Sequence, residues 1–122
     1  MIPKVQLAPD YAISQLIAGG WQLQKRSDDA IEDLLQLSRL GITTYETSDT
    51  YSYGQSLLGR FLSKARQSLP SEIYSDIQIH TRYTAPTTGS APSKATIVNS
   101  IDRSLKELKV PRLDLLQLQW WN

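Results

Sequence analysis

The side chains best suited to chemistry follow the predicted strands of the chain. A carboxylate stands at Glu46, a guanidinium at Arg82, and tyrosines at Tyr51, Tyr53 and Tyr83. Such a set could polarise and protonate a carbonyl oxygen. An ordinary phenol has a pKa of about 10 and serves as a general acid only when a nearby cation lowers that value. Arg82 could supply the cation.

The same residues also have structural interpretations. A carboxylate in a polar loop is usually a solvated charge, and a tyrosine at a strand end often packs with its hydroxyl in water. His80 lies between apolar neighbours in a predicted strand, which favours a structural histidine. Trp120 and Trp121 are typical of residues that cover a core or a subunit contact. Composition and spacing alone therefore leave the function open.

The elements that must position these residues alternate between strands and helices. Apolar β-strand patterns and helical spacings end at glycine, proline or polar clusters. The predicted strands are 16–18, 42–45, 77–81 and 113–118, and the predicted helices are 31–40, 57–65 and 97–108. The side chains of Ser27, Asp28 and Asp29 are predicted to cap the first helix, and Ser93 is predicted to cap the third. Polar loops are predicted over 47–55 and 84–93.

This order predicts parallel strands joined by helical crossovers. The sheet could be open or part of a barrel. Gly19-Gly20-Trp21-Gln22 lacks the third glycine of a dinucleotide fingerprint, so a barrel is favoured. In such a fold the active site lies at the carboxyl ends of the strands. The candidate rim is Trp21, Gln22, Glu46 to Tyr53, Arg82, Tyr83 and Gln119 to Asn122.

Charge and composition argue against several functions. The chain carries 13 basic and 12 acidic residues, with no basic stripe for a phosphate backbone, so no nucleic-acid partner is expected. It has no Cys and one His, which argues against a metal site. No apolar run reaches the roughly 20 residues of a membrane span, and Met1 to Asp10 lacks a secretory pattern. We therefore expect a cytoplasmic protein without a membrane partner.

Two segments resemble the aldo-keto reductase family. Residues 41–59 read GITTYETSDTYSYGQSLLG and match, without a gap, the family's run from a glycine through Asp-Thr-Ala-x-x-Tyr-Gly to Leu-Gly. Residues 100–120 read SIDRSLKELKVPRLDLLQLQW and resemble the family's S-L-x-x-L-x-x-D-x-x-D-L-x-x-x-H-W region. The likeness covers nearly the whole chain, with the two motifs in the family's order.

This resemblance implies a (β/α)8 barrel that reduces aldehydes or ketones with NADPH. The family's catalytic Asp, Tyr, Lys and His then fall on Glu46, Tyr51, Arg82 and Gln119. The resemblance also implies contacts of Gly20, Trp21 and Glu46 with the cofactor. The family's Tyr-Gly pair is kept as Tyr53-Gly54, which leaves Tyr53 as the alternative proton donor.

Three of these four positions depart from the family. Glu46 adds a methylene to the carboxylate, which moves it by about 1 Å. Arg82 keeps the positive charge but not the geometry of a lysine. Gln119 can donate an amide hydrogen but cannot carry a proton. We expect weakened or lost reductase chemistry.

A closed barrel takes about 250 residues, so the sequence predicts that residues 1–122 form the N-terminal part of one such domain, with four strands and three helices. Most cofactor phosphate contacts would then lie outside the chain. Two functions remain open. One is part of an NADPH-dependent oxidoreductase acting on small carbonyl compounds. The other is a non-catalytic half-barrel that associates with itself or with a complementary C-terminal half.

Overall fold

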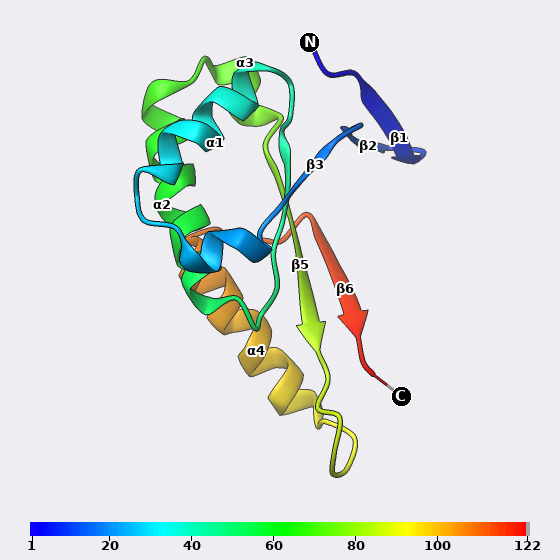
Figure 1. Cartoon of the computed structure of the whole chain (residues 1–122). Coiled ribbons are helices and arrows are strands. Elements are labelled where there is room, and N and C mark those ends of the chain that lie inside the picture. Colours follow the sequence, from blue (N-terminus) through cyan, green and yellow to red (C-terminus); the bar gives the residue numbers. More distant parts are fainter. Residues whose placement is uncertain (122) are drawn as a thin grey trace.

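The computed structural model describes residues 1–121 and is built around a four-stranded parallel sheet with helices on one face (Figure 1). The strands pair in sequence order, β3-β4-β5-β6. The strands are β3 (Ile17–Gly19), β4 (Thr44–Glu46), β5 (Gln78–Thr84) and β6 (Leu115–Gln119), and the helices are η1 (Trp21–Lys25), α1 (Ala30–Arg39), α2 (Ser52–Ser68), α3 (Ser71–Ser75) and α4 (Lys94–Leu108). The predicted parallel β-α alternation is confirmed, with strand bounds shifted by one to three residues.

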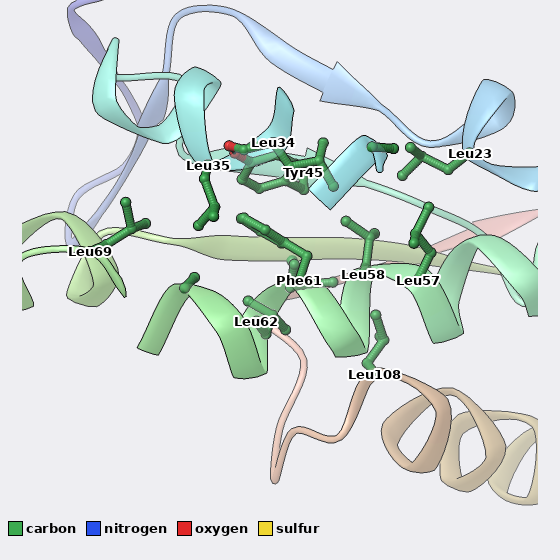
Figure 2. Close-up of a cluster of buried hydrophobic side chains, with 13 residues drawn as sticks. Leu23, Leu34, Leu35, Tyr45, Leu57, Leu58, Phe61, Leu62, Leu69 and Leu108 are labelled. Atoms are coloured by element: carbon green, nitrogen blue, oxygen red, sulfur yellow. Dashed lines mark hydrogen bonds between the residues drawn. The ribbon is translucent and has the colours of Figure 1, made fainter. Parts of the chain in front are cut away.

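The hydrophobic core lies between the sheet and helices α1 and α2 (Figure 2). On α2 the predicted apolar face is buried: Leu57, Leu58 and Phe61 have no exposed surface. The ring of Tyr45 on β4 packs against Phe61 with centroids 4.9 Å apart. Burial raises the pKa of Tyr45 to about 12, and its hydroxyl donates to the carbonyl of Leu34 at 2.9 Å. The core therefore fixes which residues of β4 face the helices.

A β-hairpin precedes the sheet and was not predicted from the sequence. It consists of β1 (Lys4–Ala8) and β2 (Tyr11–Ser14), paired antiparallel. The Ser14 hydroxyl accepts the Thr44 amide at 3.0 Å, and the Tyr11 hydroxyl lies 2.8 Å from Nε2 of His80. The hairpin thus covers the amino end of the sheet. Most of β1 is exposed, so its sequence lacks the alternation of buried and exposed residues from which a strand is predicted.

Two predicted element ends are wrong. Helix α2 begins at Ser52, so the polar loop predicted over 47–55 ends at 51. None of Ser27, Asp28 and Asp29 caps α1 with its side chain; the Asp28 carboxylate instead accepts from Arg60 at 2.7 Å. By contrast, Ser93 caps α4 as predicted, by accepting the Thr96 amide at 3.1 Å.

His80 is a structural histidine, as its sequence context predicted. It is 5% exposed, and its ring stacks on Tyr11 with centroids 6.0 Å apart. Burial lowers the pKa of His80, and the charge of Asp114 opposes this shift as the smaller effect. The folded chain therefore favours the neutral imidazole.

We predict that acid weakens the fold through His80. Because its folded pKa lies below the unfolded value, stability is complete above about pH 6.5 and declines as the pH falls below it. Urea unfolding of the wild type should show a lower free energy of unfolding at about pH 5.5 than at about pH 7.5. His80→Gln keeps a polar partner for Tyr11 but does not titrate. Its free energy of unfolding should therefore fall less between the two pH values than that of the wild type. Equal losses in both proteins would contradict the prediction.

Candidate active site

The carboxyl ends of the parallel strands bring the predicted site residues to one edge of the sheet. Glu46 ends β4 and Gln119 ends β6, and Arg82 lies near the end of β5. Alternate residues of a strand face opposite sides. Thr81 donates to Gln55 of α2 at 2.8 Å, so Arg82 points away from the helices. The register pairs Glu46 with His80 and Thr84 with Gln119, which places all three predicted residues on this face.

The Arg82 guanidinium joins the predicted catalytic residues. Nη1 donates to Oε1 of Gln119 at 2.8 Å, and Nη2 donates to the hydroxyl of Tyr51 at 2.8 Å. Nη2 also lies 2.8 Å from Oε1 of Glu46, in an ion pair whose side chains are about one-quarter exposed. All four predicted residues thus meet in one cluster, which two hydrogen bonds and one ion pair of Arg82 hold together.

Tyr51 keeps its own proton available. Arginine only donates hydrogen bonds, so the Tyr51 oxygen is the acceptor in its bond with Arg82. No acceptor for the Tyr51 proton is found among residues 1–121. The Tyr51 ring packs edge-on against Trp21 with centroids 5.4 Å apart, and its centroid lies 5.3 Å from Cζ of Arg82. Trp21 and Arg82 thus both contact the Tyr51 ring.

The other two tyrosines do not join this cluster. Tyr53 is 44% exposed, and its ring centroid lies 5.7 Å from the guanidinium carbon of Arg60. Tyr83 is 5% exposed and lies on the helix side of β5, like Thr81. The expected convergence of three tyrosines on the rim is therefore wrong, and the geometry places only Tyr51 against Arg82.

The predicted cofactor contacts lie beside Glu46. The Gly20 amide points toward Oε2 of Glu46 at 3.4 Å, and the Trp21 side chain is 65% exposed at the start of η1. Trp120 and Trp121 are also more than half exposed. Asn122, the last predicted rim residue, lies outside the described residues.

Asp49 belongs to the site's surroundings; it lies within the predicted rim, but the sequence alone assigns it no individual role. It is 7% exposed. Its carboxylate accepts the Thr84 amide at 3.1 Å and the Ser100 hydroxyl at 3.0 Å. Among the residues described, no group of three or more His, Asp or Glu side chains could hold a metal ion. No helix in that part of the chain is long and apolar enough to cross a membrane.

A parallel β-α sheet with a polar cluster at the carboxyl ends of its strands is the arrangement of β/α-barrel enzymes. The model of the aldo/keto reductase family matches residues 15–122, and the chain belongs to this family. This confirms the predicted family and fold class. No curated protein sequence matches the chain.

Two solved structures illustrate the relationship. The holo form of aldo-keto reductase AKR11C1 from Bacillus halodurans is 26% identical with a TM-score of 0.73, over 97% of this chain and 40% of that one. A putative aldo-keto reductase from Pseudomonas aeruginosa is 26% identical with a TM-score of 0.72, over 94% of this chain and 45% of that one. The chain therefore spans less than half the length of either relative.

We predict that a side chain at Gly20 destabilises the fold, because Gly20 lies directly against the backbone of Glu46 in β4. A Cβ at Gly20 would clash with the backbone carbonyl oxygen of Glu46, whereas a Cβ at Gly19 would lie 3.9 Å from the nearest atom. Gly20→Ala should therefore lower the free energy of unfolding by about 1–3 kcal/mol. Gly19→Ala is the matched control and should lose much less. Chemical denaturation measures both, and equal losses would mean that the close approach to Glu46 does not matter.

Proposed function

We propose that this chain supplies the proton-donating part of a carbonyl-reducing site, with Tyr51 as the donor. The observation that carries the proposal is the hydrogen bond from Nη2 of Arg82 to the Tyr51 oxygen. It orients the phenol and leaves its O–H free for the oxygen of a small aldehyde or ketone. Arg82 would stabilise the negative charge that develops on Tyr51 as the proton leaves.

The donor set fits a nicotinamide cofactor. When bound, NADPH supplies a hydride to the carbonyl carbon, and the oxygen of that carbonyl then requires a proton. The free O–H of Tyr51 meets this requirement. Gly20, Trp21 and Glu46 would border the cofactor, because they lie together beside the cluster.

The residues that differ from the family's catalytic set lead us to expect a weak activity. Glu46 lies 2.8 Å from Nη2 and neutralises the charge that faces Tyr51. A paired guanidinium stabilises a developing tyrosinate less than an unpaired cation does. The Gln119 oxygen is engaged by Arg82, and its amide has no titratable proton to relay. The chemistry therefore depends on Tyr51.

We predict that a chimera reveals the roles of the two tyrosines. Residues 1–122 would replace the matching segment of the Bacillus halodurans reductase, and NADPH consumption with small aldehydes would be followed by absorbance. The 122-residue chain alone should reduce none. Tyr51→Phe should lower kcat of the chimera by at least about 10²-fold, because a general acid is lost. Tyr53→Phe is the matched control and should leave kcat unchanged, so a selective loss in Tyr53→Phe would reverse the assignment.

The same chimera tests the weakened chemistry. Combining Glu46→Asp, Arg82→Lys and Gln119→His should raise turnover by about 10²-fold or more, because these residues act as a unit. Adding Tyr51→Phe should abolish that gain. Brisk turnover by the unreverted chimera would contradict the claim of impairment.

The exposed sheet edges favour a second candidate, a non-catalytic half-barrel that associates. Leu118 on β6 is 61% exposed and Ile17 on β3 is 46% exposed, each on a strand with a neighbour on one side only. Light scattering at tens of micromolar should show oligomers or aggregates. Leu118→Gln should reduce them. Leu40→Gln, at a residue that is 58% exposed after the end of α1, should not, and a stable wild-type monomer would contradict this candidate.

A further inference from the structure

Asp49 is a buried residue whose carboxylate accepts hydrogen bonds from no basic side chain among residues 1–121. Both of its oxygens accept the Thr84 amide, at 3.1 and 3.2 Å, and one also accepts the Ser100 hydroxyl at 3.0 Å. The Ser48 hydroxyl lies 3.3 Å from the other. A buried carboxylate is stable only when such donors replace its water. These bonds tie the loop before α2 to the end of β5 and to α4.

The backbone of Asp49 adds two further links. Its amide donates to the carbonyl of Arg82 at 3.0 Å, and its carbonyl accepts from Arg103 of α4 at 3.2 Å. Asp49 is therefore bonded directly to the residue that donates to Tyr51. Tyr51 itself lies two residues further along the same loop, and its amide donates to the Ser48 carbonyl at 2.9 Å.

Asp49 is thus linked to both partners of the Tyr51–Arg82 hydrogen bond. Its backbone amide binds the Arg82 carbonyl, and Tyr51 follows it by two residues in the same loop. The position of Tyr51 depends on how the preceding loop is held at Asp49. In β5, Thr84, which binds the Asp49 carboxylate, is two residues from Arg82.

If the carboxylate releases Thr84 and Ser100, the loop loses these two links. Its remaining bonds to β5 and α4 include the backbone bond to Arg82, the bond from Arg103 and the contact between the Ser48 and Thr84 hydroxyls. The Tyr51 hydroxyl would then move relative to the guanidinium, and a displacement of about 1 Å is enough to impair catalysis.

We infer that Asp49 is a positioning residue that sets the Tyr51 hydroxyl on the Arg82 guanidinium. Its importance for reduction rests on the proposed function, but its effect on the geometry of the site does not. The role belongs to the acceptor oxygens of the side chain. An asparagine should largely replace it, since its oxygen can accept the Thr84 amide and its NH2 can donate to Ser100.

Nuclear magnetic resonance of the 122-residue chain tests the geometry without turnover. Two signals report it: the nuclear Overhauser effect between the Trp21 and Tyr51 rings, and the separate Nη resonances of an Arg82 guanidinium held by its hydrogen bonds. Trp21→Phe, Tyr51→Phe and Arg82→Lys assign these signals. Asp49→Ala should lose both signals while the shift dispersion of the β1–β2 hairpin persists. If Asp49→Ala does not fold, Asp49→Ser serves instead, because its shorter side chain leaves the Thr84 amide without its acceptor.

The controls separate positioning from general stability. Asp49→Asn should keep both signals, and so should Asp102→Ala, which removes an exposed carboxylate from α4. Persistence of both signals in folded Asp49→Ala or Asp49→Ser would overturn the inference, as would their loss in Asp49→Asn or Asp102→Ala.

The chimera adds a kinetic readout. Asp49→Ala should lower kcat by about 10²-fold with little change in KM, and Asp49→Asn should restore most of it. A rise in KM alone would overturn the positioning role in catalysis. An inactive chimera that keeps the resonance signals would contradict the proposed function and leave the geometric role of Asp49 supported.

Discussion

The guanidinium of Arg82 is the group around which the residues at the carboxyl ends of the strands are arranged. Its planar fork presents donors in fixed directions, and these reach Gln119 on β6, Tyr51 before α2 and Glu46 on β4. The segment 46–51, β5 and the end of β6, which are distant in sequence, are thereby held at one point. Removing the guanidinium would leave Glu46 largely buried without its counter-charge, which is costly in such a setting.

One face of β5 connects the two ends of the sheet. Gln78 donates to the Ala12 carbonyl of the hairpin at 2.7 Å, His80 meets Tyr11, and Arg82 meets the candidate site. The opposite face carries Ile79 and Thr81 against the helices. The period of two along a strand therefore separates the packing residues from the polar ones. The hairpin supplies partners at the amino end, and the site residues supply them at the carboxyl end.

The parts of this arrangement that follow from local pattern could be predicted from the sequence. The α-β alternation and the buried face of α2 depend on spacing, and the meeting of Glu46, Arg82 and Gln119 follows from parallel strands. The hairpin could not be predicted, because most of β1 is exposed and its stability comes from pairing and from contacts such as that between Ser14 and Thr44. The sequence alone assigns no individual role to Asp49 for a related reason: Ser100, one of the donors to its carboxylate, lies on α4, some fifty residues away.

The departures from the family's residues are consistent with one another in this geometry. A glutamate carries its carboxylate one methylene further than the aspartate implied by the resemblance, and here that carboxylate reaches Nη2 of Arg82 at 2.8 Å. A guanidinium has enough donors to bind Glu46, Tyr51 and Gln119 together, and its plane fixes their directions. A lysine ammonium also has three donors, but they rotate freely. A glutamine oxygen accepts the bond that a protonated imidazole could not. Two hydrogen bonds and one ion pair of Arg82 thus connect the three substituted positions with Tyr51. In the proposed function, the same ion pair would neutralise the charge that assists proton transfer from Tyr51.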